Sequence, residues 1–163
     1  MGCFLVIFLG SSGLSIGLSL LFPQQTDKRP FIIAATFGAA LSALLVGPSY
    51  ILGFPNSSVL MAGGLFLLGG FRGLICSLAI PESLAGAVAA FPDLPIQATD
   101  RTFSVYYSLF GLVMGLFPLS ASALNKSLGF RVFFDIFSAL MLLIALLFTG
   151  SCLYDYTKEK SRE

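Results

Sequence analysis

The sequence predicts an all-α protein, a polytopic bundle of about five transmembrane helices, and three observations carry this prediction. Apolar residues make up 56% of the 163 residues and charged residues only 10%, whereas soluble domains carry about a quarter charged residues. The apolar residues gather in runs close to the roughly 20 residues with which a helix crosses the hydrocarbon core. These runs are far longer than the roughly ten-residue strands of membrane β-barrels, and a helix satisfies its own backbone within lipid.

The five apolar runs define the predicted elements in chain order. We expect helices over residues 3–22, 31–47, 59–80, 103–124 and 132–154, followed by a polar tail over residues 155–163. The first run has no basic residues before it and is longer than the apolar part of a typical signal peptide, so we interpret it as a retained helix. Pro92 and Pro95 interrupt the connector after the third helix, so residues 82–91 are expected to form the frayed end of that helix.

Small residues four positions apart predict close helix packing. Such pairs let helix backbones approach one another in lipid, where apolar burial alone does not drive association. Three predicted helices carry glycine pairs at this spacing, and the second carries alanines: Gly13 and Gly17, Gly69 and Gly73, Gly111 and Gly115, and Ala35, Ala39 and Ala43. The last helix is bulkier, rich in phenylalanine and leucine from Phe133 to Leu143, and is expected to be peripheral and exposed to lipid.

Basic residues outside the predicted helices set the expected topology, because they concentrate on the cytoplasmic side. With five crossings, six of them fall on one side and two on the other: Lys28, Arg29, Arg101, Lys158, Lys160 and Arg162 against Lys126 and Arg131. The sequence therefore predicts an integral, multi-pass protein with a cytoplasmic C-terminus. The N-terminus is expected to face the outside or a lumen.

Short motifs occur in a fixed order along the chain: Asp27-Lys28-Arg29-Pro30, Leu45-Val46-Gly47-Pro48, Pro55-Asn56-Ser57-Ser58, Ile80-Pro81-Glu82-Ser83 and Leu128-Gly129-Phe130. In order and spacing they resemble the C-terminal half of major facilitator superfamily transporters, about helices 8–12, and most of all the vesicular amine and polyamine transporter branch. The resemblance implies a partial major facilitator fold and transport of a small solute by alternating access. Facilitator substrates bind between two helical halves near the bilayer midplane. The resemblance therefore also implies that missing N-terminal helices, or a partner subunit, complete the protein.

The resemblance assigns a cytoplasmic gate to charged residues at one end of the bundle. In the superfamily, the Asp-Lys/Arg loop lies on the cytoplasmic face, and its charges break and re-form contacts during alternating access. Carried over to this chain, the gate consists of Asp27, Lys28, Arg29, Glu82 and Arg101, with Glu82 facing Arg29 or Arg101. The alternative for Glu82 is a solvated acid at a helix end.

Arg72 and Asp135 fall inside predicted helices, and both are candidate charges on a transport path. An ionisable residue within the membrane is costly and is a functional hypothesis by default. The structural alternative for Arg72 is that it reaches the cytoplasmic interface or pairs with Glu82. For Asp135 the structural alternative is pairing with Arg131, four residues earlier on the same helix face, and the functional one is binding a cation or a proton.

Two functions from different classes fit the sequence. The first is membrane transport, as all or part of a secondary transporter, and the alternative is a non-transporting structural or assembly subunit derived from one. The expected partners are the lipid bilayer and a small-molecule solute. An enzyme is not expected, because the chain has no histidine, no paired acids within the membrane and no nucleophile–base pair. We also expect no metal or other cofactor, and the net charge of +1 indicates no nucleic-acid partner.

Overall fold

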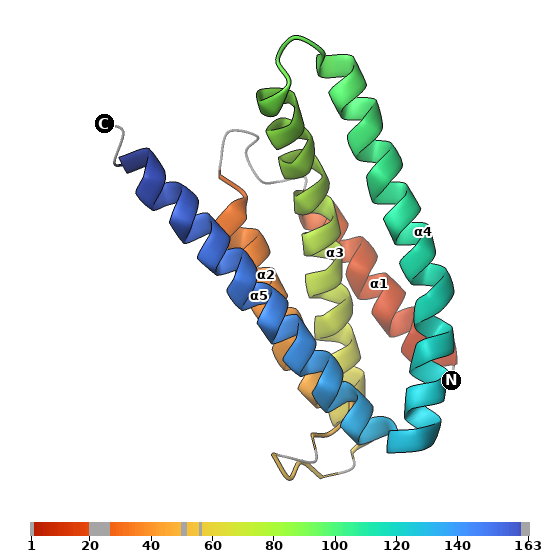
Figure 1. The fold of residues 1–163 in the computed structure, drawn as a ribbon. Coiled ribbons are helices and arrows are strands. Elements are labelled where there is room, and N and C mark those ends of the chain that lie inside the picture. The colour runs from red at the N-terminus through yellow and green to blue at the C-terminus, as the bar shows by residue number, and fades with distance from the viewer. Residues whose placement is uncertain (1, 20–26, 50–51, 56, 161–163) are drawn as a thin grey trace.

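The computed structural model describes residues 2–19, 27–49, 52–55 and 57–160, apart from the side chains at positions 114, 117, 118, 155, 159 and 160. Within these ranges the chain forms five α-helices and no strand (Figure 1). They are α1 (Gly2–Ser19), α2 (Arg29–Val46), α3 (Ser58–Ala90), α4 (Pro95–Leu128) and α5 (Phe130–Lys160). The prediction of an all-α fold is confirmed.

Four of these helices, α1, α2, α3 and α5, are long and apolar enough to cross a membrane. The fourth predicted span lies inside α4, which does not meet the same measure over its described residues. Its first turns carry polar side chains, including Asp100 and Arg101. The helices therefore fit an integral, multi-pass membrane protein.

The helices α3, α4 and α5 are longer than the sequence predicts. α3 continues through Pro81 to Ala90, because a proline removes one backbone donor while the alanine-rich stretch after it has high helix propensity. α4 begins at Pro95, where the missing N–H would have no partner within the helix anyway. The predicted frayed connector is thus helix on both sides of a short turn over residues 91–94. α5 runs on to Lys160, so the first part of the predicted tail is also helical.

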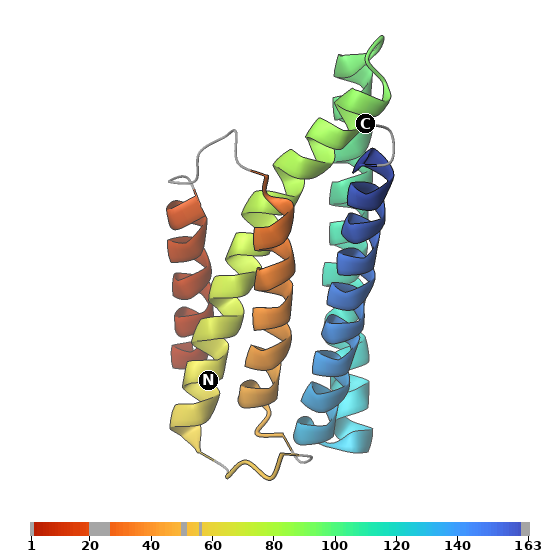
Figure 2. The ribbon, with the colours of Figure 1, turned by 90° about the vertical axis from the view of Figure 1, so that its left-hand side faces the viewer.

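α3 lies at the centre of the arrangement and contacts α1, α2 and α4. α5 packs on α2 and also contacts α4, whereas α1 and α4 do not contact each other over their described residues. Figure 1 shows the α3–α4 turn and the end of α5 at one end of the bundle, and the α2–α3 loop and the α4–α5 turn at the other. The start of α2 lies at the first of these ends (Figure 2).

The core of the protein lies along α2, which packs against α3 and α5. Ala39, Ala40 and Ala43 of α2 are at most 1% exposed. A β-carbon added at Gly38 would lie 2.5 Å from the ring of Phe71 on α3, so the two helices approach closely there. The alanine pattern that the sequence shows on the second helix is therefore a packing face.

α1 packs on α3 through serines instead of its own glycines. A β-carbon at Gly73 of α3 would lie 2.5 Å from the carbonyl oxygen of Ser12, and one at Gly69 would collide with Phe8 and Ser11. The buried residues of α1 are Ser11, Ser12 and Ser15. Of the predicted glycine pairs, the one on α3 makes a close contact, whereas no described atom lies within 4 Å of such a carbon at Gly13 or Gly17. Serine serves here because its hydroxyl can bond to a carbonyl of its own helix, as Ser11 does to Phe8 at 3.0 Å.

α5 buries one narrow face against α2 and exposes the rest. Ser138 is 1% exposed, and its hydroxyl donates a hydrogen bond to the carbonyl oxygen of Ala40 at 2.7 Å. Ala145 lies fully buried further along the same helix. The large side chains around this face, including Leu143 and Leu147, are exposed. This distribution agrees with the prediction of a peripheral last helix.

Candidate functional site

An ion pair between α2 and α3 joins two of the residues assigned to the gate. Arg29, the first residue of α2, donates from Nε to Oε1 of Glu82 on α3 at 2.9 Å. The backbone N–H of Arg29 in turn donates to the Asp27 carboxylate at 3.1 Å, which fixes how the chain enters α2. Lys28 occupies the position before the helix and makes no side-chain hydrogen bond that caps it. The structure thus brings Glu82 to Arg29, and the gating role stays a prediction.

A cavity of about 430 Å³ lies beside this ion pair, between α2, α3 and α5. The residues of its wall with polar or sulfur atoms are Arg29, Thr36, Glu82, Ser83, Ser151 and Cys152, and the rest of the wall is apolar. A second cavity of about 250 Å³ shares Arg29 and Cys152 with the first. A movement of Arg29 would therefore change the walls of both cavities.

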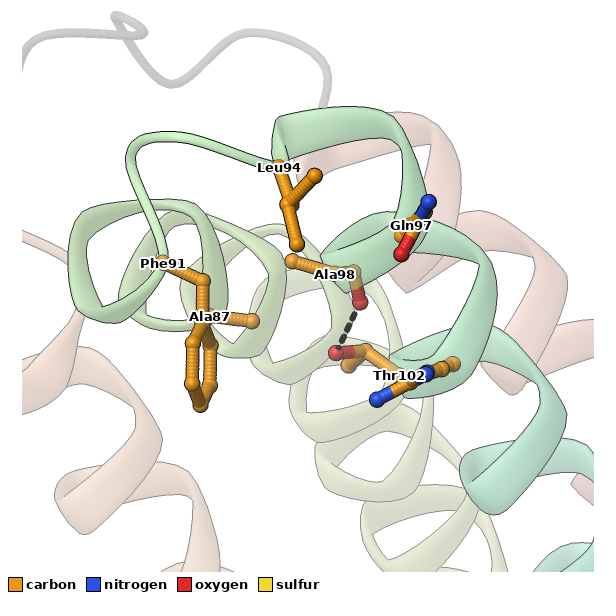
Figure 3. A pocket seen from close by; sticks show the side chains of 7 residues that line it. Ala87, Phe91, Leu94, Gln97, Ala98 and Thr102 are labelled. Carbon is orange, nitrogen blue, oxygen red and sulfur yellow. Dashed lines mark hydrogen bonds between the residues drawn. The ribbon is translucent and has the colours of Figure 1, made fainter.

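Arg101 lies apart from the ion pair. It is exposed on α4 and lines a cavity of about 120 Å³ beside the α3–α4 turn (Figure 3). Phe91 and Leu94 supply apolar parts of that wall. Glu82 pairs with Arg29 and not with Arg101. Of the predicted gate set, the structure gathers residues at the start of α2 and on α3, and leaves Arg101 outside.

Arg72 lies near the middle of α3 and faces α1. It precedes Glu82 by ten residues along the helix, or about 15 Å at 1.5 Å per residue. Arg72 therefore does not form the ion pair with Glu82 that was one alternative, and Glu82 pairs with Arg29. Instead, the guanidinium carbon of Arg72 lies 5.5 Å from the centre of the Phe8 ring on α1, which is within the range of a cation–π interaction.

Cys76 and Tyr106 complete a cluster around this arginine. Cys76 follows Arg72 by one helical turn on the same face of α3. Tyr106, on α4, lies near enough to Cys76 and Arg72 for both to act electrostatically on its hydroxyl, and α4 packs against α3. We call Phe8, Arg72, Cys76 and Tyr106 the Arg72 cluster. It combines one positive charge, one hydroxyl, one thiol and aromatic surface from three helices.

Aromatic rings extend the Arg72 cluster along α4. The Tyr106 ring stacks on Phe110 with 6.3 Å between centroids. It also meets the edge of Tyr107 at 5.6 Å, and Tyr107 stacks on Phe103 at 6.1 Å. α4 is therefore aromatic for about two helical turns around Tyr106.

Asp135 lies on a different face of the protein, buried between α5 and α2. It is 9% exposed and lies one turn before Ser138, which hydrogen-bonds to α2. Arg131 donates from Nη2 to the carbonyl oxygen of Phe54 at 3.5 Å. The predicted pairing of Arg131 with Asp135, and the cation- or proton-binding role, stay predictions. Because Asp135 faces α2, it does not share a site with Arg72.

Of the Arg72 cluster, the sequence singles out Arg72 and assigns none of Phe8, Cys76 and Tyr106 to a site. The sequence could have indicated Cys76, because it follows the candidate Arg72 by four residues and residues four apart on a helix share a face. It could not have indicated Phe8, because the contact of Phe8 with Arg72 depends on how α1 packs against α3. Over the described residues, no three His, Cys, Asp or Glu side chains are grouped so that they could hold a metal ion.

Comparison with known proteins finds no matching family model, no matching curated protein and no matching solved structure. The resemblance to the major facilitator superfamily therefore depends on the order and spacing of the short motifs alone.

Proposed function

We propose that this chain transports a small solute across a membrane by alternating access, as the C-terminal half of a secondary transporter. N-terminal helices or a partner subunit would complete the solute pathway. Four membrane-length helices support this proposal. So do a charged residue in the middle of α3 and cavities that open between helices at one end of the bundle.

The ion pair between Arg29 and Glu82 is the observation that carries the proposal. Its two side chains are 46% and 28% exposed, and such solvent-accessible pairs stabilise a protein by about 0–1 kcal/mol. The pair can therefore break and re-form at little cost. Because both residues line the cavity of about 430 Å³, each such event would change the shape of its entrance, as alternating access requires.

The exposed face of α4 supports the proposal that N-terminal helices or a partner subunit complete the transporter. No atom lies within 4 Å of where a β-carbon would stand at Gly111 or Gly115, over the described part of the chain. A helix face with small residues at this spacing suits close packing against another helix. The same face fits the alternative function, in which the chain is a structural subunit that assembles with others and transports nothing.

We further propose that the Arg29 end of the bundle is cytoplasmic, as the excess of basic residues at that end favours. Single cysteines at Lys28 and Ser57, in a protein whose native cysteines are replaced by serine, test this orientation. An impermeant maleimide should label the two positions from opposite sides of sealed vesicles. Labelling of both from one side would reject the proposed topology.

Solute flux tests the transport proposal. The protein, purified in mild detergent with any subunits that accompany it, would be reconstituted into liposomes. Osmotic swelling would then be followed with glucose, glutamate, succinate, lactate and spermidine. Reversing one charge, by Arg29→Glu or by Glu82→Arg, should slow the flux of a transported solute several-fold. The double variant R29E/E82R should restore much of it, because the pair is re-formed with its charges exchanged.

Lys28→Glu is the matched control, since it reverses a neighbouring charge outside the ion pair. It should leave the flux close to that of the unmodified protein. Absence of flux for every solute, with intact protein in the liposomes, would favour the structural alternative. Flux that responds equally to all four variants would reject the ion pair as the gate.

A further inference from the structure

The Arg72 cluster lies on α3 between two of its neighbours, α1 and α4. α3 contacts both α1 and α4, while α1 and α4 make no contact with each other over their described residues. Figure 2 shows α3 starting beside α1 and ending toward α4. Phe8 comes from α1, Arg72 and Cys76 from α3, and Tyr106 from α4. A ligand between α1 and α4 would therefore meet groups from all three helices.

Among the described residues, no Asp or Glu forms an ion pair with Arg72. The guanidinium carbon instead lies 5.5 Å from the centre of the Phe8 ring. Glu82 is about 15 Å away along the helix by rise and already pairs with Arg29. That separation exceeds the reach of an extended arginine side chain, so Arg72 does not reach the charged end of the bundle.

The contact with Phe8 leaves the guanidinium able to bind an anion. A cation–π contact uses the flat surface of the ring and the charge of the guanidinium, whereas hydrogen bonds to an anion use its N–H groups. These N–H groups form a fork that matches the two oxygens of a carboxylate. The Tyr106 hydroxyl, on the adjacent helix, can donate one further hydrogen bond.

We infer that the Arg72 cluster binds the carboxylate of a small organic anion, with Arg72 holding the carboxylate and Tyr106 donating to it. This inference rests on the proposed function, because it names the class of solute that the pathway would carry. The rings of Phe8 and Phe110 offer apolar surface to the rest of such a solute. An amine would instead meet the positive charge of Arg72 with no compensating acid in the cluster, so the site selects against cations.

Protection of Cys76 from alkylation tests this inference without measuring transport. The protein would carry Cys3→Ser and Cys152→Ser, so that Cys76 is the one remaining thiol, in nanodiscs of phosphatidylcholine. The rate of reaction with N-ethylmaleimide would be measured with benzoate, succinate, glutamate, inorganic phosphate or spermidine present. At least one carboxylate should slow the reaction threefold or more, whereas spermidine should leave the rate unchanged.

Variants at Arg72 and Tyr106 separate anion binding from general shielding of the thiol. Arg72→Gln should abolish protection and Tyr106→Phe should weaken it, each measured against that variant's own rate without ligand, because removing the guanidinium or the hydroxyl also changes the surroundings of the thiol. A protein that keeps Cys152 as its one thiol provides the control, and the same ligands should leave its reaction rate unchanged. Protection that persists in Arg72→Gln, or that spermidine also gives, would overturn the inference.

Two further measurements distinguish a free carboxylate from inorganic phosphate and from a lipid headgroup as the bound anion. If inorganic phosphate protects Cys76 and no carboxylate does, the site binds phosphate, and the inference of a carboxylate site is overturned. Slower alkylation in nanodiscs containing phosphatidylglycerol, without added solute, would assign the site to a lipid headgroup and also overturn it. Carboxylate protection in a protein that shows no flux would keep this site and reject transport. Carboxylate flux that is unaffected by Arg72→Gln would support transport and reject Arg72 as the carboxylate site.

Discussion

α2 and α4 are both helices with small residues at close spacing, yet their surroundings differ. Ala40 and Ala43 of α2 are fully buried between neighbouring helices. On α4, Leu109, Leu112 and Leu116 are each 58% exposed, and the open faces of Gly111 and Gly115 meet no described atom. Figure 2 shows α2 within the group of α1, α2 and α3, while α4 stands on the outside.

The difference shows what a pattern of small residues indicates in a membrane helix. In lipid, exposed leucine costs little, because the lipid tails are as apolar as the side chain. A glycine pair indicates that a face can accept another helix, and the pattern does not identify which helix that is. The pair at Gly69 and Gly73 receives α1 within this chain. The pair at Gly111 and Gly115 is open, which agrees with a partner outside the described helices.

The largest expected effect comes from filling one glycine of each pair. Gly73→Val places a side chain against the Ser12 carbonyl, whereas Gly111→Val meets open space. Overpacking of this kind costs about 1–3 kcal/mol. We expect Gly73→Val to lower the free energy of unfolding by about 2 kcal/mol, measured by loss of helical circular dichroism in increasing SDS.

Gly111→Val is the matched control, because both glycines lie inside helices and share the same gain in helix propensity. It should leave the unfolding midpoint near that of the parent protein. It should nevertheless weaken association with any co-purifying subunit. Equal destabilisation by the two variants would contradict the difference between the packed and open faces.

A smaller effect is expected from the hydrogen bond between α5 and α2. Ser138→Ala removes the donor to the Ala40 carbonyl, at 2.7 Å in a buried position. Hydrogen bonds between membrane helices are worth about 0.6 kcal/mol on average and up to about 1.7. We therefore expect a loss of about 1 kcal/mol in the same unfolding measurement.

Ser104→Ala tests the same loss on the exposed helix α4. Its hydroxyl donates to the Asp100 carbonyl within its own helix and is exposed. The change should alter the unfolding free energy by only a few tenths of a kcal/mol, because water can replace the bond. A larger effect from Ser104→Ala than from Ser138→Ala would contradict the assignment of the core to α2 and its neighbours.

The local signals of the sequence located most of the fold. α2 was predicted to within two residues at either end, because Pro30 marks its start and Gly47-Pro48 its end. The end of α3 was predicted too early, because Pro81 stands inside a helix that its alanine-rich continuation preserves. Helix propensity over several residues outweighed a single missing donor.

The candidate site was less predictable, because its contacts cross long stretches of sequence. Glu82 was predicted to face Arg29 or Arg101. The packing of α2 on α3 brings it to Arg29, which is 53 residues away in the sequence. Arg72 was a candidate from its charge alone, but its partner Phe8 is one of two phenylalanines of α1, Phe4 and Phe8, and the sequence does not show which of them faces α3. Which aromatic ring meets the arginine depends on the rotation of α1 against α3.

The ion pair at the start of α2 should contribute still less to stability. Arg29→Gln removes an exposed pair, which is worth about 0.2–1 kcal/mol, and Lys28→Gln removes a neighbouring charge outside the pair. The difference between the two variants should shrink as salt is raised, because salt screens exposed charges. A loss above about 2 kcal/mol for Arg29→Gln would show that the pair is a structural anchor, and it would then be too stable to serve as a gate.

A similarly small effect on stability is expected for Asp27→Asn. The asparagine oxygen can still accept the hydrogen bond from the Arg29 N–H, which Asp27 accepts at 3.1 Å. What is lost is a negative charge near the start of α2, worth about 0.3–1 kcal/mol at an exposed helix N-terminus. If Asp27 belongs to a moving gate, flux in the reconstituted protein should slow, while protection of Cys76 by a carboxylate stays unchanged. Lost protection with unchanged flux would place Asp27 in solute binding and contradict a role in gating.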